Sequence, residues 1–207
     1  MTRVKICGVT RVQDVVSAVE AGADAVGFIS GFESPRNVSL ERAAELIGKV
    51  PPFVDSVLVT RAEVLEMHLD RIGQMRPSAI QLYGGVTDPV GLKAKLGVKL
   101  ILPHLVKRGG DEIGDTEGFD AVLSDTYRKG AFGGTGEVSD WALCRELRDE
   151  VAPVPFILSG GLNPENVEKA ITAVRPFAVD SSSGVEASPG LKDSSKVRAF
   201  VDRARGM

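Results

Sequence analysis

The chain has 207 residues, of which 43% are hydrophobic and 26% are charged, and its formal net charge is −3. That length suits a single domain with a large core, and the composition excludes collagen-like, disordered and coiled-coil architectures. Lysine and arginine total 25 against 28 acidic residues, with no basic block, so we expect neither a nucleic acid nor a membrane as a partner. Two cysteines, and no apolar stretch near the ~18 residues of a membrane span, indicate a cytoplasmic protein without a disulfide framework.

Eight short apolar runs, rich in β-branched residues, recur along the whole chain. Each has the length of a buried strand, and the spacing of roughly 20–35 residues leaves room for one helix in each gap. The runs are Val4–Cys7, Ala25–Ile29, Phe53–Val59, Ala79–Leu82, Val98–Leu102, Phe119–Leu123, Val154–Leu158 and Phe177–Asp180.

Helical periodicity is visible in several of these gaps. Apolar residues at i, i+3, i+4 and i+7 begin at Val12, Leu40, Val167 and Val197. This spacing places them on one face of a helix, which is the face that we expect to cover the strands.

Local start and stop signals refine these helices. Thr10 and Thr60 each precede a glutamine or glutamate with capping-box spacing, and Asn163-Pro164 combines an N-cap residue with a proline at the first helical position. We therefore expect all three to begin helices. The helix at Pro89–Leu96 is weaker, and glycines break any regular helix between Pro103 and Gly118.

Alternating strands and helices without a linker indicate one parallel α/β domain over residues 1–207. A doubly wound sheet has fewer strands and carries its glycine-rich phosphate turn after the first strand. A (β/α)8 barrel, also called a TIM barrel, has eight strand–helix units and often binds phosphate at the ends of strands 7 and 8. The count and the placement of the glycines favour a compact, single (β/α)8 barrel.

The ends of the last two predicted strands carry glycines and serines. Gly160 and Gly161 follow one strand, and Ser182, Ser183 and Gly184 follow the next. Amides without a side chain approach an anion closely, and the dipole of a following short helix favours negative charge. Each cluster alone also fits a simple tight turn, but two adjacent clusters in a barrel predict a phosphate site.

Two candidate acid–base groups lie at other strand ends. Cys7 ends the first strand beside Gly8, and both a buried structural cysteine and a functional thiol fit that place. Asp125 follows an apolar run, which fits either a turn aspartate or a general acid. The other cysteine, Cys144, falls in a helical run and is expected to be structural.

The remaining polar strand ends suggest substrate contacts. Arg36 is a planar bidentate donor suited to a carboxylate, although a lone arginine after a proline also fits plain surface, and Asp180 has the same two interpretations as Asp125. The glycine-rich stretch 129–136 does not match a dinucleotide fingerprint and is better explained as a mobile loop over the barrel mouth. The histidines and cysteines show no metal-ligand spacing, so no metal site is expected.

Together these strand ends resemble the phosphoribosylanthranilate isomerase family of tryptophan biosynthesis. The motifs that carry the resemblance are Lys5-Ile-Cys-Gly8, Ser34-Pro-Arg36, Gln81-Leu-Tyr-Gly84, Asp125-Thr126, Phe132-Gly-Gly-Thr-Gly136, Leu158-Ser-Gly-Gly-Leu162 and Asp180-Ser-Ser-Ser-Gly-Val-Glu186. They run in the same order from residue 3 to about residue 190. The family usually has histidine where Tyr83 stands, so the role of that position is open.

The resemblance implies an Amadori rearrangement of N-(5-phosphoribosyl)anthranilate to 1-(2-carboxyphenylamino)-1-deoxyribulose 5-phosphate. It implies that Asp125 is the acid and Cys7 the base, and that Arg36 holds the anthranilate carboxylate while Asp180 faces the developing positive nitrogen. The glycine and serine ends would hold the phosphate. No cofactor is implied, because the protonated imine is itself the electron sink.

Two rival functions remain from the sequence. One is another sugar-phosphate barrel enzyme, such as an epimerase or a synthase, although such epimerases usually need metal ligands that this sequence does not show. The other is a non-catalytic barrel that binds a phosphorylated ligand, against which the presence of both Cys7 and Asp125 argues. Monomer and homodimer are both open.

Overall fold

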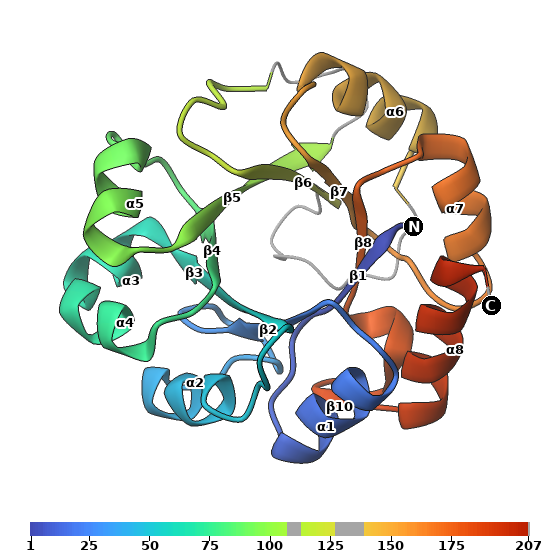
Figure 1. The fold of residues 1–207 in the computed structure, drawn as a ribbon, viewed down its shortest axis with the longest axis horizontal. Coiled ribbons are helices and arrows are strands. Elements are labelled where there is room, and N and C mark those ends of the chain that lie inside the picture. The colour runs from blue at the N-terminus through green and yellow to red at the C-terminus, as the bar shows by residue number, and fades with distance from the viewer. Residues whose placement is uncertain (107–112, 127–138, 207) are drawn as a thin grey trace.

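The protein forms a closed barrel of parallel strands. The computed structural model describes residues 1–106, 113–126 and 139–206. In it, β1 to β8 are hydrogen-bonded in chain order, and β8 pairs back to β1 to close the ring. Figure 1 looks down this ring, with the helices arranged around its outside. The predicted (β/α)8 barrel is therefore confirmed, and a doubly wound open sheet is excluded.

Each barrel strand overlaps one of the predicted apolar runs. The strands are β1 (Arg3–Ile6), β2 (Ala25–Ile29), β3 (Asp55–Arg61), β4 (Ala79–Tyr83), β5 (Lys99–Val106), β6 (Ala121–Thr126), β7 (Phe156–Leu158) and β8 (Ala178–Ser181). Strand β6 extends beyond its apolar run, so Asp125 lies inside the strand rather than after it. The apolar pattern marks the buried middle of a strand and misses an end whose interior side chains are polar.

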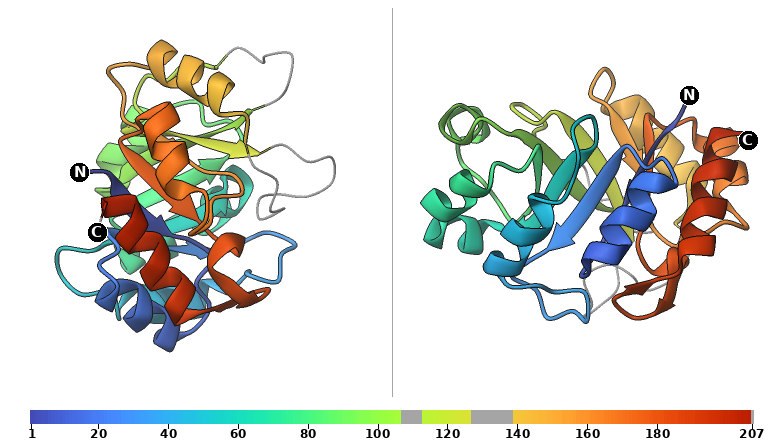
Figure 2. Two further views of the ribbon diagram at one scale, coloured as in Figure 1. Left: turned by 90° about the vertical axis from the view of Figure 1, so that its right-hand side faces the viewer. Right: turned by 60° about the horizontal axis from the view of Figure 1, so that its bottom comes forward.

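Helices follow most of the strands and pack on the outside of the barrel. They are α1 (Val12–Glu20), α2 (Leu40–Ile47), α3 (Ala62–Met67), α4 (Leu69–Met75), α5 (Pro89–Leu96), α6 (Trp141–Glu150), α7 (Val167–Val174) and α8 (Ser194–Arg205). Figures 1 and 2 show α6, α7, α8 and α1 as successive neighbours around one side. The expected helix α5 is confirmed, with the Asp88 side chain accepting a hydrogen bond from the Gly91 amide at its start. None of the helices in the described ranges is long and apolar enough to cross a membrane.

Two of the three expected helix caps are wrong. The N-cap residues of α1 and α3 follow Thr10 and Thr60 by one position and make no side-chain cap. The Thr10 hydroxyl instead donates to the Gly190 carbonyl oxygen at 2.8 Å, and Thr60 is buried inside β3. Asn163 does accept hydrogen bonds from two amides, in the turn that leads into α7. Tertiary contacts thus decided where the threonine side chains point.

Alternation along the strands divides the core into two parts. One set of side chains packs between the strands and the helices, and the other fills the barrel interior. The buried interior layer contains Cys7, Val57, Val59, Ala79, Ile101, Ala121, Leu123, Ile157 and Ala178. Closer to the carboxyl ends of the strands, buried polar side chains replace these aliphatic ones. The expected loop 129–136 lies outside the described residues, as does part of the segment between Pro103 and Gly118.

Candidate active site

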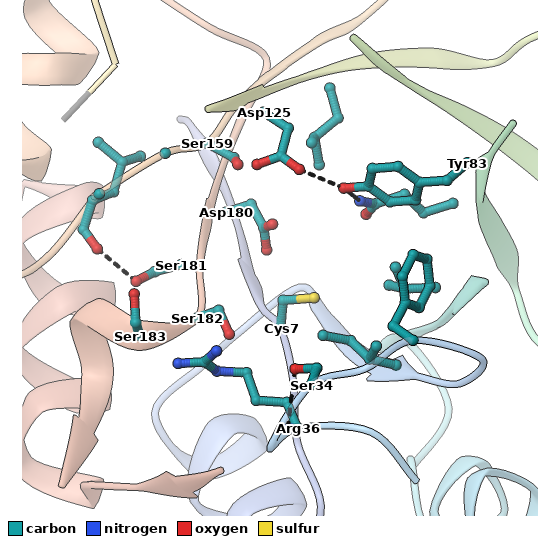
Figure 3. Close-up of a pocket in the computed structure, with 18 residues that line it drawn as sticks. Cys7, Ser34, Arg36, Tyr83, Asp125, Ser159, Asp180, Ser181, Ser182 and Ser183 are labelled. Atoms are coloured by element: carbon teal, nitrogen blue, oxygen red, sulfur yellow. Dashed lines mark hydrogen bonds between the residues drawn. The ribbon is translucent and has the colours of Figure 1, made fainter. Parts of the chain in front are cut away.

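A cavity opens at the carboxyl ends of the strands, with about 780 Å³ of empty space, part of which is open to solvent. It is lined by residues on or after β1, β2, β3, β4, β6, β7 and β8. The sequence-predicted residues among its lining are Cys7, Arg36, Asp125, Gly160, Gly161, Asp180, Ser182 and Ser183. Figure 3 shows Cys7, Asp125 and Asp180 facing this cavity from three different strand ends.

Cys7 follows directly after β1 and is 5% exposed. Room for its sulfur comes from Gly27 on the neighbouring strand β2, because a Cβ there would lie 2.8 Å from the Cys7 Sγ. Burial raises the pKa of the Cys7 thiol above its ordinary value, and the Lys5 and Lys192 ammonium groups only partly oppose that effect. Burial thus favours the neutral thiol, whereas the two ammonium groups favour the thiolate.

Asp125 projects from β6 into the same cavity and is 5% exposed. The Tyr83 hydroxyl donates a hydrogen bond to its Oδ2 at 2.7 Å. Tyr83 in turn packs edge-to-face against Phe32, with ring centroids 5.4 Å apart. Burial and the neighbouring Asp125 charge raise the pKa of Tyr83 well above its ordinary value, so the phenol keeps its proton. The carboxyl group is thus held by a neutral donor.

Lys5 is a buried cation that sequence reasoning passed over. Its Nζ lies 3.2 Å from Oδ1 of Asp180 and 2.9 Å from Oε1 of Gln81, and the residue is 3% exposed. Burial lowers the pKa of Lys5, but the charges of Asp180 and Cys7 outweigh it, so the pKa is raised and the amine stays charged. The sequence did indicate that Lys5 lies near Cys7, because residues two positions apart in a strand have side chains on the same face.

Arg36 does not stand alone in the cavity wall. Its Nε and Nη2 donate to the two carboxylate oxygens of Glu186 at 2.9 and 2.7 Å, a bidentate and buried pair. The fully buried Lys192 ammonium lies 2.9 Å from Glu186 and 3.0 Å from the carbonyl oxygen of Ser182. This three-membered charge cluster connects the arginine to the serine loop after β8.

Glu186 and Lys192 were not predicted as site residues. They lie on β9 (Glu186–Ser188) and β10 (Leu191–Lys192), which pair with each other as a two-stranded antiparallel sheet after β8. Although burial alone would raise it, the pKa of Glu186 is lowered by hydrogen bonds from Arg36 and Lys192. The six-residue spacing of Glu186 and Lys192 does not by itself predict an ion pair. The pair forms because a tight turn between β9 and β10 brings the two side chains together.

The glycine and serine ends form one wall of the cavity. Gly160 and Gly161 have φ values of 95° and 64°, a left-handed backbone that favours glycine. Within residues 1–106, 113–126 and 139–206, the amides of Gly160, Gly161 and Ser182 donate no hydrogen bond to a backbone carbonyl oxygen. Next to them, the short 3₁₀ helix η1 (Ser183–Val185) begins, as the sequence indicated. These groups can meet an anion at close range.

Gly184 occupies a different place from the other predicted phosphate residues. It belongs to η1 but is not part of the cavity lining. A Cβ at this position would lie 2.0 Å from the Leu162 carbonyl oxygen, so glycine is needed for the close approach of two backbone segments. Its contribution is to let η1 pack against the loop after β7.

Two further expectations concern residues outside the cavity. Cys144 is buried on α6, and burial raises the pKa of its thiol to about 11, as suits an inert structural cysteine. In the part of the chain that the structure describes, no three histidine, cysteine or acidic side chains gather as metal ligands do.

A closed (β/α)8 barrel whose strand ends bring a thiol, two carboxyl groups and glycine- and serine-rich loops together around one cavity has the architecture of a barrel enzyme. Residues 4–203 match the family model described as N-(5'-phosphoribosyl)anthranilate isomerase. The chain is therefore an isomerase and belongs to that family.

Similar proteins cover the chain from end to end. The N-(5'-phosphoribosyl)anthranilate isomerase of Natronomonas pharaonis is 44% identical over 100% of this chain and 99% of its own length. The crystal structure of phosphoribosyl anthranilate isomerase from Thermotoga maritima is 39% identical, with a TM-score of 0.81 and full coverage of both chains. Another such structure, in complex with reduced 1-(o-carboxyphenylamino)-1-deoxyribulose 5-phosphate, is 38% identical with a TM-score of 0.77 and the same full coverage.

Proposed function

We propose that this isomerase converts N-(5'-phosphoribosyl)anthranilate to 1-(2-carboxyphenylamino)-1-deoxyribulose 5-phosphate, a step of tryptophan biosynthesis, by general acid–base catalysis. The observation that carries the proposal is that Cys7 and Asp125 face one cavity whose wall also contains the glycine and serine ends of β7 and β8. A phosphorylated substrate bound at that wall has its sugar between the two side chains.

In the proposed reaction, Asp125 gives a proton to the furanose ring oxygen. The bond from that oxygen to C1 breaks, its electron pair stays on the oxygen, and the nitrogen lone pair forms a protonated imine. The Cys7 thiolate then removes the proton from C2, and the released pair forms the C1–C2 double bond and neutralises the nitrogen. Addition of a proton at C1 and formation of the C2 ketone complete the isomerisation. No atom is lost, and no cofactor is required.

The other residues bind and orient the substrate in this proposal. Arg36 holds the anthranilate carboxylate with the donors that Glu186 leaves to it, and Asp180 faces the positive nitrogen of the imine. Gly160, Gly161, Ser182 and Ser183 bind the phosphate, with the Lys192 ammonium behind Ser182. Burial raises the pKa of Cys7, whereas Lys5 and Lys192 lower it. These two cations are therefore important for the reaction, because only the thiolate can act as the base.

The test is the fluorescence decay of phosphoribosylanthranilate with the purified protein and with Cys7→Ala and Asp125→Asn. We expect losses above about 100-fold in kcat for both variants, the range that a general acid or base commonly supplies. Cys144→Ala is the matched control, because it removes the other buried cysteine outside the cavity, and it should keep its activity. Full activity in either cavity variant rejects that residue's role, and an inactive parent rejects the function.

Assembly and location remain part of the proposal. A related structure is described as monomers generated from the dimeric isomerase of Thermotoga maritima, so we propose a monomer or a homodimer for this chain. Light scattering on the purified protein distinguishes the two. A cytoplasmic location stays a prediction from the sequence.

A further inference from the structure

A chain of hydrogen bonds crosses the barrel mouth from β1 to β6. Lys5 Nζ lies 2.9 Å from Oε1 of Gln81, Gln81 Nε2 lies 3.2 Å from the Tyr83 hydroxyl, and that hydroxyl lies 2.7 Å from Oδ2 of Asp125. Figure 3 shows the Tyr83 ring directed across the cavity toward Asp125. Neither Gln81 nor Tyr83 has a role in the proposed reaction described above.

Donor and acceptor chemistry sets the direction of every bond in this chain. An ammonium group only donates, so the amide oxygen of Gln81 must face Lys5. The amide nitrogen of Gln81 therefore faces the phenol oxygen and donates to it. Tyr83 has one hydroxyl hydrogen, and the structure has this hydroxyl donating to Oδ2 of Asp125.

We propose that Tyr83 is a positioning residue for Asp125, which fixes Oδ2 as a hydrogen-bond acceptor and keeps the transferable proton on Oδ1. A proton on Oδ2 would meet the phenol hydrogen, so two donors would face each other. The inference rests on the proposed role of Asp125 as the acid.

The bond also favours the transfer itself. A hydrogen bond to a carboxylate is stronger than one to a neutral carboxylic acid. The Tyr83 hydroxyl therefore stabilises Asp125 more as the proton leaves, and such an interaction contributes to the chemical step rather than to substrate binding. Phe32, which packs edge-to-face with the Tyr83 ring, keeps the phenol in place.

The first experiment measures complete pH–rate profiles of Tyr83→Phe, which removes the hydroxyl and keeps the ring against Phe32. Without its donor, Asp125 holds its proton more tightly, so the profile's Asp125 limb moves to higher pH by about one unit. We expect the rate constant of the correctly protonated form to fall about tenfold, with KM within about twofold of the parent. An unchanged profile overturns the proposal, whatever happens to the thermal midpoint.

Tyr83→His supplies the rescue variant. An imidazole N–H is again a donor at this position, and we expect it to recover most of the rate constant that Tyr83→Phe loses. A histidine variant as slow as the phenylalanine variant overturns the proposal.

A double-mutant cycle separates action through Asp125 from an independent role. In the Asp125→Asn background, Tyr83→Phe should produce no further loss in kcat, because its partner no longer transfers a proton. Equal losses in both backgrounds overturn the proposal. An inactive parent rejects the proposed function, and full activity of Asp125→Asn rejects the acid role on which this inference rests. A failure confined to Tyr83→Phe rejects only the positioning role.

Discussion

The Lys5 ammonium lies 3.2 Å from the Asp180 carboxylate inside the barrel, and both side chains are almost completely buried. The two residues are direct register partners on β1 and β8, so they share one layer of the interior. Lys5 also lowers the pKa of Cys7, which burial and Asp180 raise. A single cation thus neutralises Asp180 and favours the thiolate of the proposed base.

Lys5→Met is expected to move the Cys7 limb of the pH–rate profile to higher pH. With the cation gone, burial and Asp180 both hold the proton on the thiol, so less thiolate is present at neutral pH. We expect kcat/KM at pH 7 to fall about tenfold for each pH unit of the shift. Thiolate absorbance, followed in a Cys144→Ala background, reports the same titration directly.

The control for this substitution concerns stability. Removing one partner of a buried ion pair typically destabilises a protein by about 3–5 kcal/mol, because it leaves Asp180 without its counter-charge. The double variant Lys5→Met, Asp180→Asn should regain part of that stability. A Lys5→Met profile that superimposes on the parent's contradicts the proposed influence on Cys7.

Gly27→Ala tests whether the thiol needs the space beside it. The added methyl group would lie 2.8 Å from the Cys7 Sγ and 3.2 Å from its Cα, so the side chain must shift. We expect a loss of about 1–3 kcal/mol in the free energy of unfolding, as for other overpacked cores. Activity should fall at least about tenfold, because a misplaced base is less effective.

Gly48→Ala is the matched control for that variant. Gly48 lies at the end of α2 with φ −65°, and a Cβ there meets no atom closer than 3.5 Å. We expect parent activity and a thermal midpoint equal to or slightly above the parent's. If Gly27→Ala behaves like Gly48→Ala, the cavity does not depend on the close approach of β2 to Cys7.

The sequence was sufficient for the architecture and for the placement of most candidate residues. Apolar runs at regular spacing depend only on burial, and eight of them predicted the barrel that the structure contains. Cys7 and Asp125 were found because each lies at the end of an apolar run. The structure places both at one cavity, and their catalytic roles stay predictions.

Contacts between distant segments were beyond sequence reasoning. The partner of Arg36 is a glutamate 150 residues away, and its position depends on the closure of the whole ring. The contact of Lys192 with Ser182 spans only ten residues, but it depends on the tight turn between β9 and β10. Even the local rule for helix caps failed at Thr60, because burial in β3 took precedence over capping.

Ser183→Asp tests the proposed phosphate wall. Ser183 lines the cavity at the start of η1, and a carboxylate there would face the phosphate with like charge. We expect KM to rise at least about tenfold while kcat changes little, and inhibition by inorganic phosphate to weaken in parallel. Ser183→Asn, of nearly the same size and without the charge, serves as the control. Unchanged phosphate inhibition in the aspartate variant argues against a phosphate at this place.

Arg36→Met tests whether Arg36 binds the carboxylate of the substrate. Glu186 occupies Nε and Nη2 of the arginine and holds its plane, so the remaining N–H groups are directed by that pair. A charged hydrogen bond of this kind typically contributes about 1.5–3 kcal/mol, so we expect KM to rise about 10- to 100-fold with a smaller change in kcat. An unchanged KM rejects the contact.

Two inhibitors make that test specific. One is a reduced analogue of the product, and the other is the same molecule without its ring carboxylate. If Arg36 binds the carboxylate, Arg36→Met loses affinity for the first inhibitor and keeps its affinity for the second. An equal loss for both would instead mean that the arginine acts through Glu186 and Lys192 on the loop at Ser182, because that loop faces both inhibitors alike.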